Sequence, residues 1–161
     1  MPENKWIRGL LGGAVAFVVA NVVSNVLFFR LFSGVLFDPA HQSEKVIAVL
    51  FEMEPLPIMF SNGLLYLAIA AGIGMVHGLV FVYIEPVLPH RNVVSRGVAF
   101  AAILWGLMAL YFEFHVPFNM FGEPVLIVVL ELLLWVIVLL TEGILLSLLF
   151  GKQRSTAGAQ G

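Results

Sequence analysis

The sequence VLIVVLELLLWVIVLLTEGILLSLLF, from Val125 to Phe150, decides the fold class of this chain. As an α-helix this stretch is about 39 Å long, which is enough to cross the roughly 30 Å hydrocarbon layer of a bilayer with some tilt. It therefore predicts a membrane-spanning helix.

Two carboxyl groups interrupt this apolar run, Glu131 and Glu142. At 100° per residue they return to within about 20° of one another, on a stripe that also carries Trp135 and Val138. A carboxyl group inside a bilayer is costly and faces other helices, a cavity or a cation. These two glutamates are therefore the leading candidates for function.

The composition places the whole chain in one class. Hydrophobic residues make up 61% and charged residues 11% of the 161 residues, against roughly 45–50% and 25% in soluble domains. The chain is predicted to be one integral membrane domain over residues 1–161. A net charge of −2 argues against a nucleic-acid partner, and the absence of cysteine excludes disulfides, iron–sulfur clusters and covalently attached haem.

Hydropathy predicts three further spans, at about 7–32, 63–84 and 93–112. Together with 125–150 they form an all-α, antiparallel four-transmembrane-helix bundle, followed by a flexible tail at 152–161. The first connection contains Asp38 and Pro39, a typical helix start, and a helix from there would end before Pro55. This short helix is predicted to lie in the membrane interface.

The distribution of basic residues predicts that both termini are cytoplasmic, in a cell inner or plasma membrane. One side of the membrane receives six basic residues and the other receives two. The six are Lys5, Arg8, Arg91, Arg96, Lys152 and Arg154, and the two are Arg30 and Lys45.

Polar residues in the first span share one helix face, at Asn21, Ser24 and Asn25. One interpretation is that their side chains hydrogen-bond to neighbouring helices, as polar residues in spans usually do. The alternative is that they line a path for a ligand or water.

The second span carries small residues at every fourth position, Ala70, Gly74 and Gly78, a pattern that lets two helix backbones approach closely. His77 lies beside this seam. It is interpreted as a neutral core histidine, with a haem or chlorin on His77 as the alternative; no other cofactor and no metal site is predicted.

Approximate depths suggest partners for the ionisable side chains. Glu142 and His77 lie at similar depths near the cytoplasmic side and are candidate partners. Glu131 lies near the level of Arg30, with which it would form an ion pair. The alternative for Glu131 is a shallow site shared with polar residues of the last connection, Glu113, His115, Asn119 and Glu123.

No complete catalytic motif is present, so the chain is not predicted to be an enzyme. The first functional hypothesis is an accessory or assembly subunit that packs through its small-residue seam against other membrane subunits or itself. The second is a small proton-coupled transporter that uses Glu142 with His77, and Glu131 with the outer connection. The third is a haem or pigment carrier.

Overall fold

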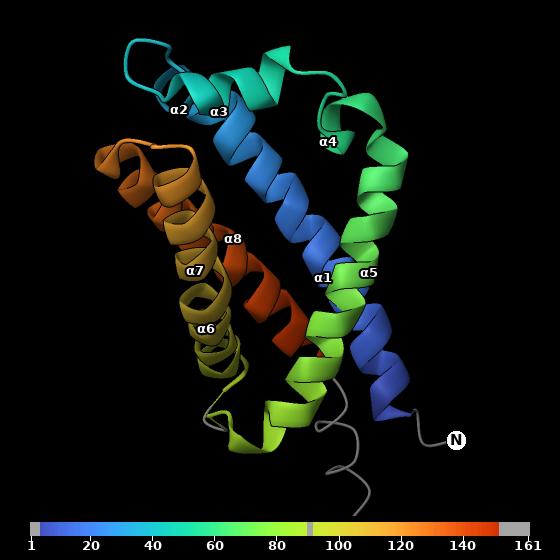
Figure 1. Cartoon of the computed structure of the whole chain (residues 1–161). Helices are drawn as coiled ribbons and strands as arrows, with labels where there is room; N and C mark the ends of the chain where they lie inside the picture. Colours follow the sequence, from blue (N-terminus) through green and yellow to red (C-terminus); the bar gives the residue numbers. More distant parts are fainter. Residues whose placement is uncertain (1–3, 90–91, 152–161) are drawn as a thin grey trace, which may run out of the picture.

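The computed structural model describes residues 4–89 and 92–151, all of whose regular structure is helical. Four segments are long and apolar enough to cross a membrane: Lys5–Leu31, Gly63–Val87, Val93–Met120 and Val125–Phe150. Their helices are α1 (Lys5–Val26), α5 (Gly63–Ile84), α6 (Val93–Leu104) with α7 (Leu110–Glu113), and α8 (Val125–Gly151) (Figure 1). The prediction of four such helices is confirmed. The predicted tail at 152–161, with Lys152 and Arg154, and also Arg91 lie outside the described residues.

Asparagine side chains start three of the four long segments. The side chain of Asn4 accepts a hydrogen bond from the backbone N–H of Trp6, and that of Asn62 accepts one from Leu65, each at 3.0 Å. Asn92 accepts one from Ser95 at 2.7 Å in a reciprocal capping box. Each cap satisfies a backbone donor that the first helical turn leaves without a partner.

The third long segment continues beyond its predicted end at residue 112. A π-helical turn at Trp105–Ala109 separates α6 from α7, and a second π-helix, Phe114–Met120, follows α7 and contains Pro117. Proline lacks a backbone N–H and is disfavoured inside an α-helix. In a π-helix the backbone hydrogen bonds join residues five apart instead of four, and this change of pattern tolerates a residue without an N–H. The residues predicted to form a connection after position 112 are therefore largely helical.

The connection between α1 and α5 holds a π-turn (Leu27–Leu31) and three short helices, α2 (Ser33–Leu36), α3 (Glu44–Ile47) and α4 (Ile58–Ser61). The predicted helix start at Asp38 is wrong. Asp38 instead closes a tight turn, in which its Oδ1 accepts from the N–H of Ala40 at 2.9 Å. The helix begins at Glu44, after Ser43, and a π-turn extends it over Ala48–Glu52, so that it does end before Pro55.

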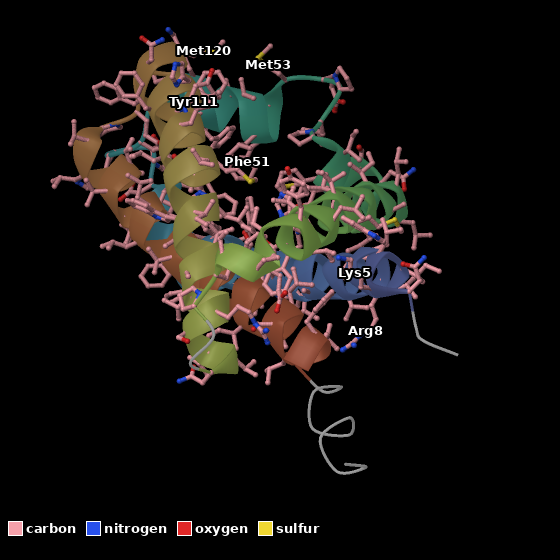
Figure 2. All side chains as sticks on the ribbon, turned by 90° about the horizontal axis from the view of Figure 1, so that it is seen from below. Lys5, Arg8, Phe51, Met53, Tyr111 and Met120 are labelled. Atoms are coloured by element: carbon pink, nitrogen blue, oxygen red, sulfur yellow. The ribbon has the colours of Figure 1, made fainter. Side chains whose placement is uncertain are left out.

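The four long segments associate mainly as two pairs, α1 with α5 and α6 with α8, which are joined by contacts between α1 and α8. Figure 1 shows α2, α3 and α4 at the end of the molecule opposite to the N-terminus. Seen from below, Phe51 lies between the ribbons of α7 and α5 (Figure 2). The connection that carries Phe51 therefore lies across one end of the space between the two pairs.

Glycines form the contact between α1 and α5. A Cβ atom added to Gly74 would overlap the carbonyl oxygen of Gly13, and one added to Gly78 would overlap that of Gly9. The predicted close helix approach at Ala70, Gly74 and Gly78 therefore exists, but it lies inside this chain. These glycines are covered by α1 and are not exposed for a partner protein.

A buried arginine connects the ends of α5, α6 and α8. Arg96 forms an ion pair with Glu85 at 3.1 Å and donates from Nε to the hydroxyl of Ser147 at 2.9 Å. Ser147 in turn donates to the backbone carbonyl of Val93 at 2.8 Å. Arg96 therefore holds the helix ends together in addition to contributing to the charge distribution of the sequence.

Candidate functional site

The face of α8 that carries Glu131, Trp135, Val138 and Glu142 lines two neighbouring cavities. The first cavity, which we call the inner cavity, has a volume of about 250 Å³ and is lined by Glu142. The second cavity, nearer the connection between α1 and α5, has a volume of about 290 Å³ and is lined by Glu131. We call it the outer cavity, and both names refer only to position along the bundle. Both cavities are lined by Ser24 and Trp135 as well as by Phe112 of α7. The two glutamates thus occupy successive compartments of one cleft between α1, α7 and α8.

Glu142, which lines the inner cavity, forms a buried pair with His77 of α5. The Nδ1 atom of His77 lies 2.7 Å from Oε1 of Glu142, and Glu142 is 0% exposed. The ring of Phe17 packs edge-on against the imidazole, with 5.1 Å between the ring centroids. The second carboxyl oxygen of Glu142, Oε2, is buried without a hydrogen-bond partner among the residues described.

The surroundings of His77 do not fit a haem or chlorin. The helix face beside His77 is the one that carries Gly74 and Gly78, and the backbone of α1 fills the space directly above them. One imidazole nitrogen is engaged by Glu142 and the ring itself is covered by Phe17. A flat macrocycle would need the volume that α1 and Phe17 occupy, so the structure offers it no place on this face.

The outer cavity contains three carboxyl groups, from Glu113 of α7, Glu123 of the following connection and Glu131 of α8. Each offers one carboxyl oxygen, and these three atoms all lie within 4.8 Å of one another. We call this set the outer carboxyl cluster. Glu113 is 1% exposed and Glu123 2% exposed. At an effective dielectric constant of about 20, two like charges at this separation repel by about 3 kcal/mol, so three ionised carboxylates require a compensating proton or cation.

Two nitrogen donors hold the outer carboxyl cluster in place. The indole Nε1 of Trp135 donates to Oε1 of Glu113 at 2.6 Å, and the side-chain amide of Gln42 donates to Oε1 of Glu123. The same amide nitrogen donates to the backbone carbonyl of Leu36 at 2.9 Å, which fixes its position. The other oxygens, Oε2 of Glu113 and Oε2 of Glu123, are buried and have no hydrogen-bond partner within the described part of the chain.

Two residues predicted to join the cluster do not do so. His115 is exposed, lies 2.9 Å through Nδ1 from the backbone carbonyl of Tyr111, and stacks on the Tyr111 ring. Asn119 is also exposed. Because residues 114–120 are helical, successive side chains point around the axis, and Val116 and Pro117 line the outer cavity where His115 and Asn119 do not.

The ion pair predicted between Glu131 and Arg30 is not formed. Arg30 lies in the π-turn after α1 with an exposed side chain, and across residues 4–89 and 92–151 no salt bridge joins it to Glu131. Glu131 lies with two other acids instead. Arg30 and Glu131 lie at similar positions along the helix axes. Position along the axis does not determine the direction in which a side chain points, and that of Arg30 points to the surface.

One amide of α1 hydrogen-bonds to another helix, and both amides line the cavities. Asn21 accepts a hydrogen bond from the hydroxyl of Tyr66 on α5 at 2.7 Å, and it lines the inner cavity. Asn25 lines the outer cavity and donates to the backbone carbonyl of Asn21 at 3.0 Å. Asn21 therefore connects two helices and also borders the cleft.

Sequence reasoning missed the part that Gln42 plays. The residue lies 81 positions before Glu123, in a turn that was predicted to be helical. Trp135 was placed on the correct stripe of α8, but its hydrogen bond to Glu113 depends on the helical extension beyond residue 112. A glutamine in a polar connection gives no sign in the sequence that its side chain binds a distant glutamate.

The pH dependence of stability is expected to depend on Glu123. Burial raises the pKa of this carboxyl above its usual value, so its neutral form is favoured by folding. The free energy of unfolding should therefore be higher below the usual glutamate pKa of about 4.3 and fall as pH rises through the raised value. Thermal unfolding in detergent with a chelator, repeated across about pH 4 to pH 8, measures how steeply the free energy of unfolding changes with pH.

Glu123→Gln should reduce that slope, because an uncharged amide keeps the size of the side chain and does not titrate. Glu52→Gln, at an exposed position of the first connection, is the matched control and should leave the slope unchanged. Equal slopes in the wild-type protein and Glu123→Gln would contradict the assignment.

Comparison with known proteins found no matching family model, no matching curated protein and no matching solved structure.

Proposed function

We propose that this chain is a small membrane carrier that moves protons through the cleft between α1, α7 and α8, where its proton-binding groups lie. The observation that carries the proposal is the pair of adjoining cavities, one lined by Glu142, which pairs with His77, and the other lined by the outer carboxyl cluster. Ionisable side chains inside a membrane bundle are uncommon and are typical of proton and ion pathways.

The His77–Glu142 pair has the chemistry of a proton-binding site. An imidazole and a carboxyl group at hydrogen-bond distance are able to pass a proton between them. Glu142 lines the inner cavity, and its buried Oε2 has no partner in the described segments, so this oxygen remains available as a proton acceptor. A proton that reaches the inner cavity therefore has a group to receive it.

The proposed arrangement in the membrane is an antiparallel bundle with both termini in the cytoplasm. Lys5 and Arg8 lie at the N-terminal end of α1, and Glu123 lies in the connection that precedes α8. With the positive-inside rule, the His77–Glu142 pair belongs to the cytoplasmic half and the outer carboxyl cluster to the opposite half. The first connection, with α3, would then lie in the outer interface.

Proton flux into liposomes tests this proposal. Wild-type protein should dissipate an imposed pH gradient, measured with an enclosed pH-sensitive dye and a potassium ionophore, faster than protein-free liposomes. Glu142→Gln should lower that rate by at least about tenfold, because the amide keeps a hydrogen bond to His77 but cannot carry a proton.

Glu52→Gln is the matched control for this assay and should keep the wild-type rate, since its exposed carboxyl lies away from both cavities. Equal proton flux in wild-type protein, Glu142→Gln and empty liposomes would reject the carrier proposal.

The accessory or assembly subunit is the second candidate. The small-residue seam no longer supports it, but a separate groove of about 320 Å³ between α6 and α8 is entirely apolar. Its lining residues are Val98, Ala101, Ala102, Trp105, Val136 and Leu140. Purification in mild detergent with a stable second subunit, together with absent proton flux, would favour this role.

A further inference from the structure

We propose that the outer carboxyl cluster of Glu113, Glu123 and Glu131 binds one hard divalent cation, of the class of Mn²⁺ and Ca²⁺. The inference uses the same cleft as the proposed carrier function and adds the chemical class of its ligand. It does not require transport, because binding is measurable on protein in detergent.

The spacing of the carboxyl groups suits a single ion. Oxygen ligands lie about 2.1–2.5 Å from Mn²⁺ or Ca²⁺, so two ligands on opposite sides of one ion are up to about 5 Å apart. The three carboxyl oxygens of the cluster lie within 4.8 Å of one another and come from three different segments of the chain. An ion between them replaces mutual repulsion by attraction to each carboxylate.

Two unsatisfied oxygens give an independent indication of a ligand. Oε2 of Glu113 and Oε2 of Glu123 belong to side chains that are at least 98% buried, and neither accepts from an N–H or hydroxyl donor among the described residues. Glu131 is the neighbour of both carboxyl groups, but a protonated Glu131 has a single O–H and satisfies only one of the two. Buried polar atoms are nearly always hydrogen-bonded or bound to an ion, because a buried polar atom without a partner has lost its contact with water and gained nothing in return. A cation held by these carboxyl groups would supply the missing interaction.

The outer contacts of the cluster resemble those that orient metal-binding carboxylates. Trp135 and Gln42 each donate to Oε1 of one glutamate, which leaves the second oxygen of that carboxyl group available. Gln42 is itself held, since its Oε1 accepts from the N–H of Ser43 at 2.5 Å. Such supporting hydrogen bonds fix ligand orientation and strengthen metal binding.

The donor set selects the class of cation. All the converging ligands are carboxyl oxygens, the chain contains no cysteine, and the nearby His115 is directed to the backbone carbonyl of Tyr111. Carboxylate sites without nitrogen or sulfur ligands suit Mg²⁺, Ca²⁺ and Mn²⁺ better than Zn²⁺ or Cu²⁺. Mn²⁺ is the practical probe because its unpaired electrons report free and bound ion directly.

The test is a titration of the purified full-length chain in detergent with Mn²⁺, at neutral pH and after removal of chelator. Free Mn²⁺ is followed by electron paramagnetic resonance. We expect saturable binding of one ion per chain and competition by Ca²⁺. Glu131→Gln should weaken binding at least about tenfold, and Trp135→Phe, which keeps an aromatic side chain but removes the N–H donor, should weaken it by about 10- to 100-fold.

Glu52→Gln is the matched control, because it changes an exposed carboxyl group of the first connection that lies outside the cluster, and it should bind Mn²⁺ like the wild-type protein. Thermal unfolding of each variant shows whether it is folded. No saturable binding by folded wild-type protein, or equal affinity in wild-type protein and folded Glu131→Gln, would overturn the cation site. Binding without proton flux would reject only the carrier function, whereas proton flux without binding would reject only the cation site.

Discussion

Leucine in place of Gly78 should prevent α1 and α5 from packing and leave little folded protein. A Cβ atom at this position would lie 2.7 Å from the carbonyl carbon of Gly9 and 3.1 Å from Cα of Gly13. Both neighbours are backbone atoms, so the helices must separate along their whole contact. Overpacking by a methyl group alone costs about 1–3 kcal/mol, and Gly78→Leu adds three further carbon atoms. Size-exclusion chromatography and thermal unfolding in detergent measure the loss.

Gly72 provides the matched control on the same helix. Nothing lies within 4 Å of a Cβ atom built at this position, so Gly72→Ala should leave stability unchanged or raise it by up to about 1 kcal/mol through helix propensity. If Gly78→Leu unfolds at the same temperature as Gly72→Ala, α1 does not cover the glycines. The seam would then be available to another protein, as the accessory-subunit hypothesis requires.

The small-residue pattern illustrates what the sequence reveals and what it leaves open. Ala70, Gly74 and Gly78 correctly predicted a close helix contact, because the absence of large side chains is a local property. The identity of the partner helix is not local. Gly9 and Gly13 in the first span have the same four-residue spacing, and the structure places the two patterns against one another.

Hydropathy predicted the ends of the long helices correctly wherever the sequence changes abruptly from apolar to polar. The third segment has no such change, because Phe114, Val116 and Phe118 alternate with polar residues up to Met120. Pro117 also favoured an earlier end, since proline normally terminates an α-helix. The π-helical turn that retains Pro117 inside the segment is stabilised by contacts with α8 that no local pattern reports.

The periodicity of α8 placed Glu131 and Glu142 correctly on one face, and both line the cleft. Their partners were harder to predict. His77 was assigned to Glu142 from depth alone, and the two side chains do meet. The same reasoning failed for Arg30, because a π-turn after α1 redirects its long side chain to the surface. Depth along a helix limits the choice of partner, but rotation about the axis decides it.

His77→Leu should destabilise the folded protein strongly. Glu142 is fully buried, and its only hydrogen bond among the described residues is to Nδ1 of His77. Removal of one member of a buried pair leaves an uncompensated polar group and typically costs about 3–5 kcal/mol. Thermal unfolding in detergent measures the change, with Val76→Leu, at an exposed position one residue earlier, as the control.

The double substitution His77→Leu with Glu142→Leu separates the structural role of the pair from its proposed use in proton transfer. Replacement of both members by apolar residues of similar size removes the unmet desolvation cost, so stability should return to near the wild-type value. Proton flux should not return, because neither side chain then binds a proton. Wild-type stability in His77→Leu alone would show that the pair does not stabilise the bundle, and rapid proton flux in the stable double variant would exclude Glu142 and His77 from the pathway.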